Sequence, residues 1–377
     1  MQTANRNKTF TILSALSITL ILLGHLNCGI LTIGEMFPYY SYHVMLFVFI
    51  SGYFYHPEDE TNILKYIQRK AKKLLLPYFI YNLLYGILAT MLHYADFSIG
   101  ENVSLYNLFL APFLSGHQFM YNATAWFVPA LFLIEICNII GRKILSVLHL
   151  ENEWLILFLY LALGCMTVFL AKRGSVYEYY KLPGRILFML PAFQFGRIYN
   201  TKLEAHDTLP SYLYFPILFV CQIILIMNNG GLGFSTVWVS GFANNALIPY
   251  LTTITGIAFW LRIAKLLAPA FGENKHWQYL GENTYAVMMH HLFVFFFIKS
   301  VFYGLSNVTS LFQDFDSVLF HSDIYYTYLP DGFIQWYWLY LILGLCIPLL
   351  LHAISQKALK CFQTSRLGTL LHNSRGC

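Results

Sequence analysis

The chain has 377 residues, of which 58% are hydrophobic and only 11% charged, and its mean hydropathy is +0.56. A soluble domain carries about 25% charged residues, so this composition excludes a soluble globular protein and predicts a polytopic membrane protein. The net charge of +5 does not indicate nucleic-acid binding, because basic residues also mark the cytoplasmic side of membrane proteins. No long polar block interrupts the apolar pattern, which predicts one integral all-α helical bundle.

Apolar stretches of about 20 residues, the length that crosses a bilayer, recur along the chain. They predict about ten transmembrane helices, over residues 11–30, 42–56, 74–94, 125–140, 154–171, 185–199, 211–228, 245–262, 283–303 and 335–353. The predicted organisation is therefore a cytoplasmic N-terminus of residues 1–10, a transmembrane domain of residues 11–353 and a cytoplasmic C-terminal tail of residues 354–377.

The distribution of basic residues predicts the orientation, since short cytoplasmic loops accumulate Lys and Arg. Of the 23 Lys and Arg residues, only Lys172, Arg173 and Lys181 fall in the loops of one side, and Arg185 and Lys299 fall inside predicted spans. Both termini are therefore predicted to be cytoplasmic. The cysteines are scattered and show neither metal-ligand spacing nor a disulfide framework, so no metal site is predicted.

A histidine lies inside the first apolar run. His25 is the only Asp, Glu, His, Lys or Arg between Ile12 and Ile33, and ionisable groups in membrane segments commonly mark reaction centres or transport pathways. At 1.5 Å per residue it lies about 21 Å from the cytoplasmic start of its helix. A neutral imidazole there can accept a proton from an attacking hydroxyl, which makes His25 the first catalytic candidate. The alternative is a histidine that is hydrogen-bonded to a backbone carbonyl or to a neighbouring helix.

His43 opens the second predicted span, ahead of an aromatic run and the pair Ser51-Gly52. Small residues let helices pack closely, and His43 comes near His25 if the first two spans form a hairpin. This arrangement indicates a substrate-binding role for His43. An interfacial histidine beside a helix-packing seam accounts for the same residues.

Five basic residues lie within nine positions after the second span. On a regular helix, four of them share one face because of their i, i+4, i+7 and i+8 spacing: Lys65, Arg69, Lys72 and Lys73. Such a face can bind the phosphates of a nucleotide-type ligand, with arginine as a bidentate partner and lysine as a point charge. Cytoplasmic loops beside anionic lipid headgroups have the same composition, so both interpretations stay open.

The ninth predicted span contains two adjacent histidines, His290 and His291, near the bilayer midplane. Neighbouring helix positions point about 100° apart, so only one is expected to face the bundle interior together with Thr284. Two histidines at this depth are hard to explain by packing, which makes His291 a catalytic candidate and Thr284 a substrate-binding one. Glu135 in the fourth span either pairs with a histidine or faces the cytoplasm.

The predicted outer loop of residues 304–332 carries aspartates and tyrosines, among them Asp323, Tyr326 and Tyr328. Acidic groups and aromatic faces can hold a sugar, but aromatic residues also form belts at the headgroup level of membranes. We favour the aromatic belt and assign none of these residues to a site.

Several of these segments together resemble the acyltransferase-3 family of bacterial inner-membrane acyltransferases, especially its sugar O-acetyltransferase branch. Gly24-His25 is similar to the family's first-helix histidine, and His43 to Gly52 is similar to its FHMPLFFFISG stretch. Three further segments match in order and spacing: Arg69 to Lys72 in the RxxR position ahead of Pro77, Trp126-Phe127 as the WF pair, and Leu280 to His291 as the LGxxS…YLxH ending.

The resemblance implies a ten-helix bundle in the bacterial inner membrane that takes an acyl group from cytoplasmic acetyl-CoA. The acceptor it implies is a hydroxyl on a lipid-linked or surface polysaccharide sugar, and His25 is then essential. Lys65, Arg69, Lys72 and Lys73 would bind the acetyl-CoA, Trp126 would contact substrate, and no metal is required.

The chain departs from the family pattern at two positions. Ser14 stands where the family usually carries an arginine, eleven residues before the histidine, and Lys72 replaces the second arginine of RxxR. The donor site is then rearranged, the donor differs, or the enzyme is impaired. The main alternative function is a transporter or flippase for a lipid-linked sugar, in which the histidines relay protons. It predicts substrate movement without acetyl-CoA consumption, and a structural membrane subunit is a third possibility.

Overall fold

The computed structural model describes residues 7–26, 29–175, 180–243, 245–328 and 333–364. Parts of the predicted terminal segments 1–10 and 354–377 lie outside these residues. The described chain is helical, with no β-strand and one isolated bridge between Ser235 and Ser240. This confirms the predicted all-α polytopic bundle.

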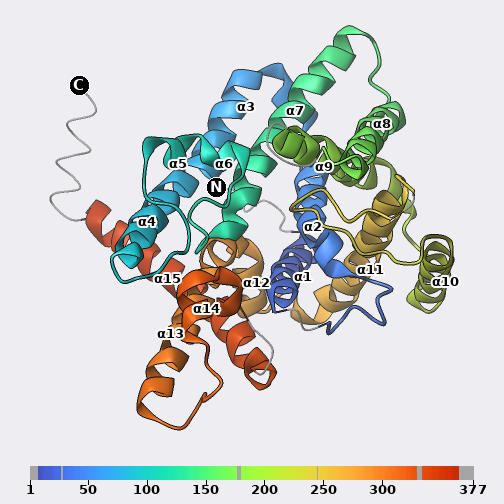
Figure 1. Cartoon of the computed structure of the whole chain (residues 1–377). Helices are drawn as coiled ribbons and strands as arrows, with labels where there is room; N and C mark the ends of the chain where they lie inside the picture. The colour runs from blue at the N-terminus through green and yellow to red at the C-terminus, as the bar shows by residue number, and fades with distance from the viewer. Residues whose placement is uncertain (1–6, 27–28, 176–179, 244, 329–332, 365–377) are drawn as a thin grey trace, which may run out of the picture.

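Each predicted span coincides with a long helix (Figure 1). These helices are α1 (Lys8–His25), α2 (Tyr39–Tyr53), α4 (Leu76–His93), α7 (Phe127–Val147), α8 (Glu153–Lys172), α9 (Lys181–Ile198), α10 (Ser211–Asn229), α11 (Ile248–Phe271), α13 (Thr284–Val308) and α15 (Tyr337–Thr364). The shorter α-helices are α3 (Ile63–Lys70), α5 (Leu105–Phe109), α6 (Ala111–Leu114), α12 (Lys275–Glu282) and α14 (Ser317–Ser322). The connections also contain 3-10 turns η1 (Pro57–Thr61), η3 (Ala123–Trp126), η6 (Glu204–His206), η7 (Ile324–Thr327) and η8 (Ile334–Trp336), and π-helical turns η2 (Ala71–Leu75) and η5 (Tyr199–Leu203).

Within the described chain, 8 helical segments are long and apolar enough to cross a membrane. The two other predicted spans are α2, which has only 15 residues, and α9, whose 18 residues include Lys181, Arg185 and Arg197. Both are interior helices, because most of their residues are buried against other helices. By contrast, α10 lies at the edge of the bundle and exposes most of its apolar residues (Figure 1).

The ends of α1 have local causes, and they fix the position of His25. The Asn7 side chain caps the first turn by accepting a hydrogen bond from the Phe10 backbone amide. The helix ends at His25, five residues before its predicted end. The loop that follows has positive φ angles at Gly29 and Leu31, which a right-handed helix cannot adopt. His25 therefore lies at a helix end, and the predicted span 11–30 was too long.

The two interior helices α2 and α9 pack backbone against backbone. A Cβ atom added to Gly52 would lie 1.8 Å from the Phe193 carbonyl oxygen, and one added to Gly196 would lie 2.0 Å from the Phe49 carbonyl oxygen. Small residues permit this close approach, so Gly52 forms a packing seam near the end of α2, nine residues after His43.

We expect Gly52→Ala to destabilise the protein by about 3 kcal/mol, because the added methyl group meets backbone atoms that cannot move aside as a flexible side chain can. Thermal unfolding in detergent would measure this. Gly304→Ala is the matched control, since nothing lies within 4 Å of the Cβ position of this helical glycine. An unchanged Tm for Gly52→Ala would contradict the close packing of α2 and α9.

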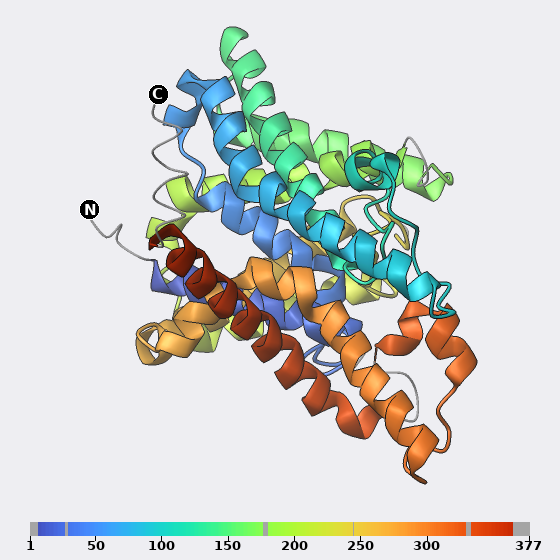
Figure 2. The ribbon, with the colours of Figure 1, turned by 90° about the vertical axis from the view of Figure 1, so that its left-hand side faces the viewer.

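The long helices run side by side between two ends of the bundle (Figure 2). At the end that carries α3, called the α3 end, Asn7 donates a hydrogen bond to Tyr53, whose hydroxyl donates to Glu204. Lys8 pairs with Glu273 at the same end. The opposite end, called the α14 end, carries residues 94–122, 230–243, 245–247, 309–328 and 333–336 of the loops.

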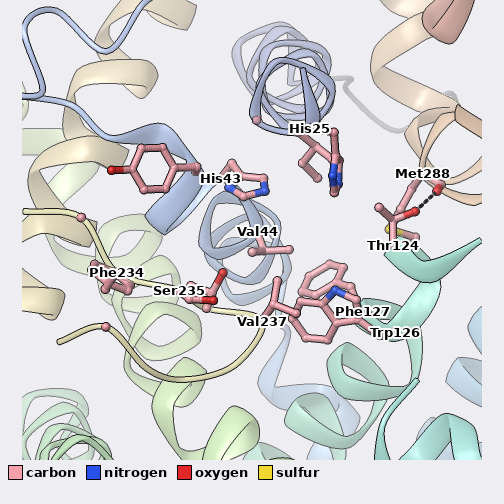
Figure 3. Close-up of a pocket in the computed structure, with 16 residues that line it drawn as sticks. His25, His43, Val44, Thr124, Trp126, Phe127, Phe234, Ser235, Val237 and Met288 are labelled. Atoms are coloured by element: carbon pink, nitrogen blue, oxygen red, sulfur yellow. Dashed lines mark hydrogen bonds between the residues drawn. The ribbon is translucent and has the colours of Figure 1, made fainter. Parts of the chain in front are cut away.

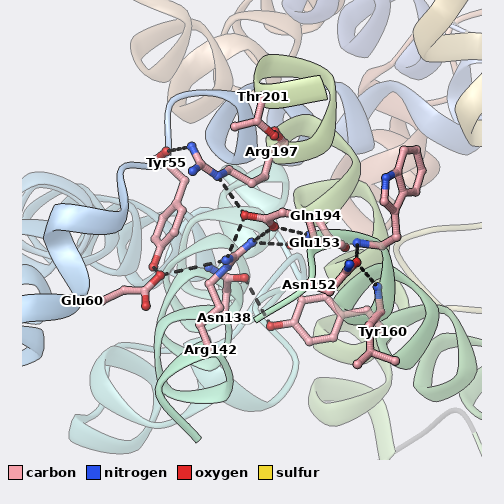
Figure 4. Close-up of polar contacts among 12 residues, drawn as sticks. Tyr55, Glu60, Asn138, Arg142, Asn152, Glu153, Tyr160, Gln194, Arg197 and Thr201 are labelled. Atoms are coloured by element: carbon pink, nitrogen blue, oxygen red, sulfur yellow. Dashed lines mark hydrogen bonds and ion pairs between the residues drawn. The ribbon is translucent and has the colours of Figure 1, made fainter. Parts of the chain in front are cut away.

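A buried ionic network ties α7, α8 and α9 together at the α3 end (Figure 4). Arg142 donates to Glu153 at 2.5 Å and to the Gln194 side chain at 2.8 Å. Arg197 donates to the Tyr55 carbonyl oxygen at 3.1 Å, which joins the network to the end of α2. Each buried guanidinium here has a carboxylate partner, as the burial of a charge requires.

Candidate active site

A cavity of about 440 Å³, called the histidine cavity, lies where α1 and α2 meet η3 and the loop segment of residues 233–241 (Figure 3). Its walls come from segments far apart in the sequence: Ile21, Gly24, His25, Tyr40, His43, Val44, Thr124, Trp126, Phe127, Gly233, Phe234, Ser235, Thr236, Val237, Gly241 and Met288. The structure thus brings together three of the predicted site residues, namely His25, His43 and Trp126.

His43 reaches the histidine cavity from the start of α2. Its Nδ1 lies 2.9 Å from the Tyr39 carbonyl oxygen, which only accepts hydrogen bonds. Nδ1 therefore carries the proton, and Nε2 keeps its lone pair. In this tautomer His43 can accept a hydrogen bond from a substrate hydroxyl, which suits the predicted substrate-binding role.

His291 lies directly behind His25 and is completely buried. The centroids of the two rings are 5.4 Å apart. His291 Nδ1 donates to the Val287 carbonyl oxygen at 2.8 Å, and its Nε2 has no partner among the described residues. His290 points elsewhere and hydrogen-bonds to Tyr85 at 2.8 Å. Of the two adjacent histidines, His291 thus faces His25, and its free Nε2 can exchange a proton with a neighbouring group.

Trp126 and Phe127 form the wall of the histidine cavity at the start of α7. The segment that holds them is tied to α13, because the Thr124 hydroxyl donates to the Met288 carbonyl oxygen at 2.7 Å (Figure 3). The position of Met288 is thereby fixed against this wall.

A second cavity of about 280 Å³, called the Lys73 cavity, lies on the side of α3 and is lined by Phe47, Lys73, Leu74, Phe127, Val128, Leu131, Glu282, Thr284, Tyr285 and Met288. Phe127 and Met288 line both cavities and form the partition between them. Thr284 lies seven residues before His291, about 10 Å along the helix. The structure therefore places Thr284 beside Lys73 and not beside His25.

A family model described as an acyltransferase domain, Acyl_transf_3, matches residues 8–353 of the chain. The chain belongs to the acyltransferase-3 family. The match includes both cavities and supports membrane acyltransferase activity in general. No curated protein and no solved structure matches the chain.

In this acyltransferase-3 protein the basic residues predicted to bind the donor have separate environments. Arg69 forms an ion pair with Asp59 at 2.7 Å, Lys73 lines its cavity, and Lys65 and Lys72 are exposed. Lys65 and Arg69 lie in α3, but Lys72 and Lys73 lie in the π-helical turn η2 that follows it, so the α-helical spacing that predicted one shared face does not hold. Lys73 is the member of this group that reaches the cavity next to the histidines.

Glu135, which the sequence predicted either to pair with a histidine or to face the cytoplasm, pairs with Lys70 of the basic loop. Its Oε1 accepts a hydrogen bond from Lys70 Nζ at 2.6 Å, and the residue is only 1% exposed. The pair joins α3 to the interior of α7 and neutralises one of the five clustered charges.

Ser14, which stands in place of the family's arginine, makes no ionic contact in the described structure. Its hydroxyl donates to the Phe10 carbonyl oxygen at 2.9 Å, within the same helix. The chain therefore lacks the cation that the family usually places on this helix.

Sequence reasoning assigned no role to Tyr328, Thr236 or Met288, all of which the structure places at or beside the site. Tyr328 packs edge-on against His25 with ring centroids 5.3 Å apart, so the aromatic-belt interpretation is wrong for this residue. Thr236 lines the histidine cavity with a buried hydroxyl that has no partner among the described residues. The concentration of glycines around Thr236, from Gly230 to Gly241, is the one sequence feature that could have drawn attention to this loop.

Proposed function

We propose that this protein transfers an acetyl group from cytoplasmic acetyl-CoA to a hydroxyl of a lipid-linked or surface polysaccharide sugar. The proposal places it in the bacterial inner membrane with both termini and the α3 end in the cytoplasm. The observation that carries it is that Phe127 and Met288 separate a cavity lined by Lys73 from a cavity lined by His25 and His43. A thioester can reach this partition from one side and a hydroxyl from the other.

The donor occupies the Lys73 cavity. The CoA phosphates bind near Lys73, and the exposed Lys65 and Lys72 extend the positive surface around its entrance. Arg69 contributes where a phosphate replaces Asp59, since both present oxygens to the guanidinium fork. The pantetheine arm passes Thr284, whose hydroxyl can bond to its amide groups, and brings the thioester to the partition.

The acceptor hydroxyl enters the histidine cavity and attacks the thioester carbonyl carbon. His25 takes the hydroxyl proton as the new carbon–oxygen bond forms, and it returns a proton to the CoA sulfur when the carbon–sulfur bond breaks. His43 holds the acceptor by its free Nε2, and His291 accepts or supplies a proton through His25. The same imidazole can also attack the thioester itself and carry the acetyl group transiently. Retention of labelled acetyl on the protein in the absence of acceptor distinguishes the second route.

Purified protein in lipid nanodiscs, supplied with radiolabelled acetyl-CoA and lipid-linked sugars, tests the proposal. We expect label in the lipid fraction and CoA release that requires the acceptor. Mass spectrometry of the surface polysaccharide from a deletion strain should show the loss of one acetyl increment per modified unit. Movement of the sugar across the membrane without CoA release would instead establish the flippase.

Lys73→Gln should raise the KM for acetyl-CoA roughly tenfold with little change in kcat, because a charge-assisted contact to phosphate is worth about 1.5–3 kcal/mol and is made equally in the ground and transition states. Steady-state kinetics at varied acetyl-CoA measure both constants. Lys143→Gln is the matched control, since Lys143 is an exposed lysine that lines neither cavity. An unchanged KM in Lys73→Gln would place the donor elsewhere.

A further inference from the structure

A surface cleft adjoins the histidine cavity at the outer end of the hairpin that α1 and α2 form. The start of α1 and the end of α2 are hydrogen-bonded to each other at the α3 end, so the loop between the two helices lies at the α14 end. The cleft, called the hairpin cleft, has a volume of about 380 Å³, and its lining includes Gly24, Thr32, Glu35 and Tyr40. Glu35 and Tyr40 are exposed, so the hairpin cleft opens to the surface.

The hairpin cleft and the histidine cavity meet at two residues, because Gly24 and Tyr40 line both of them. Gly24 directly precedes His25 on α1. Tyr40 lies three residues before His43 on α2, a spacing that places both side chains on one side of a helix. A ligand in the hairpin cleft therefore lies one residue from His25 along α1 and one turn from His43 along α2.

The loop that carries Glu35 is held in place by contacts of the residues around it. The buried Thr32 donates its hydroxyl hydrogen to the Gly29 carbonyl oxygen at 2.8 Å, and the Phe37 amide donates to the Thr32 carbonyl oxygen at 2.9 Å. The Phe37 ring is fully buried and stacks on Phe259 of α11 with ring centroids 4.3 Å apart. These contacts give the hairpin cleft a defined shape, as is usual for sites that bind small ligands.

The lining of the hairpin cleft suits a sugar and disfavours a negatively charged one. Among the described residues, Glu35 is the one Asp, Glu, Lys or Arg that lines this cleft, and no residue of these four types lines the histidine cavity. An anionic sugar would therefore meet a like charge and no basic partner. Carboxylate oxygens accept strong hydrogen bonds from hydroxyls. The Tyr40 ring, 42% exposed, offers a flat apolar face with a polar tip, on which the carbon–hydrogen face of a sugar ring can pack.

We propose that the hairpin cleft binds the acceptor as an uncharged sugar residue, with the sugar ring on Tyr40 and a sugar hydroxyl bonded to the Glu35 carboxylate. Held in this way, the sugar can place a further hydroxyl in the adjoining histidine cavity, where His25 is the proposed base. The inference rests on the proposed function for the role of this sugar as acceptor. It adds the place where the acceptor binds and the charge that it carries.

Binding of matched sugars by the protein in phosphatidylcholine nanodiscs tests this inference. Saturation-transfer NMR, which detects weak binding, compares glucose, galactose and mannose with their uronates, each of which carries a carboxylate in place of the terminal hydroxymethyl group. We expect at least one hexose to bind about tenfold or more tightly than its uronate, because the added carboxylate lies close to that of Glu35. Equal affinities, tighter binding of the uronates, or no binding of any hexose would overturn the inference.

Glu35→Gln should remove this preference for the uncharged sugar, because glutamine keeps a hydrogen-bonding group but carries no charge. Glu101→Gln is the matched control and should keep the preference, since Glu101 is an exposed glutamate of the α14 end that lines a different cleft. Thermal unfolding shows whether both variants are folded. A preference that survives in folded Glu35→Gln protein, or that Glu101→Gln removes, would place the sugar elsewhere and overturn the inference.

Tyr40→Ala should weaken hexose binding about fivefold or more, because the sugar loses the aromatic face on which it packs. Tyr94→Ala is its matched control, since Tyr94 is an exposed tyrosine of the α14 end that lines neither the hairpin cleft nor the histidine cavity. Native hexose affinity in folded Tyr40→Ala protein would contradict the inference. If phosphatidylethanolamine in the nanodisc abolishes hexose binding, Glu35 holds the ammonium of a lipid headgroup, and the inference is wrong.

The binding measurement contains no acetyl-CoA, so its result is independent of acetyl transfer. Hexose-selective binding by a protein that transfers no acetyl group would contradict the proposed function and leave the hairpin cleft supported as a site for uncharged sugars. Acetyl transfer to an anionic sugar, together with no preference for hexoses in binding, would contradict only the further inference.

Discussion

Replacing His25 with alanine should lower acetyl transfer at least about a hundredfold, because a positioned general base or acid contributes roughly 10²–10⁴ in rate. His25 lines the histidine cavity, and the free nitrogen of His291 lies behind it. No other described histidine occupies this position at the end of α1. Release of CoA from acetyl-CoA in the presence of acceptor measures the loss.

The matched control is His290→Gln, which changes a histidine of the same membrane region that hydrogen-bonds to Tyr85 and lines neither cavity. It should retain most of the activity, since glutamine preserves a hydrogen-bonding group. Thermal unfolding of both variants separates lost chemistry from lost folding. Full turnover by folded His25→Ala protein would remove this residue from the mechanism.

The bundle was predictable from the sequence because membrane helices can be recognised by the length and the apolar composition of their segments. Even the interior helices α2 and α9 were found, since apolar side chains suit a protein interior as well as lipid. The end of α1 was not predictable, because Ile30 and Leu31 continue the apolar pattern into the loop after His25. The positive φ angles at Gly29 and Leu31, which end the helix, cannot be read from the hydropathy of the sequence.

The candidate site was predictable in part. Depth in the membrane identified His25 and His291 singly, but only packing could show that their rings lie 5.4 Å apart. Composition identified the basic loop, but it could not show that Asp59 engages Arg69 or that Lys73 faces a cavity. The contact of His25 with His291, and the cavity that Lys73 lines, both bring together segments distant in the sequence.

The contacts of Arg185 were beyond prediction for the same reason. Arg185 was recognised only as a charge inside a span, and its partners are backbone carbonyls of two other loops. A carbonyl oxygen is present at every residue, so no sequence pattern marks the ones that a buried guanidinium will use.

Filling the partition between the two cavities should stop acetyl transfer without preventing donor binding. Met288 lines both cavities, and Met288→Trp places a bulky indole at the point where, in the proposed reaction, the thioester meets the acceptor. We expect kcat to fall at least about a hundredfold, since a misplacement of about 1 Å at the reacting atoms can cost this much. The affinity for acetyl-CoA, which depends on the Lys73 cavity, should change little.

Met288→Leu is the matched control, because a volume-conserving apolar exchange usually costs less than about 1.5 kcal/mol and leaves the partition as it is. Equilibrium binding of labelled acetyl-CoA and single-turnover transfer, measured on both variants, separate donor binding from chemistry. If Met288→Trp binds acetyl-CoA and still transfers at the native rate, the donor reaches His25 by another route. If it binds the donor and transfers nothing while Met288→Leu remains active, the acetyl group crosses at Phe127 and Met288.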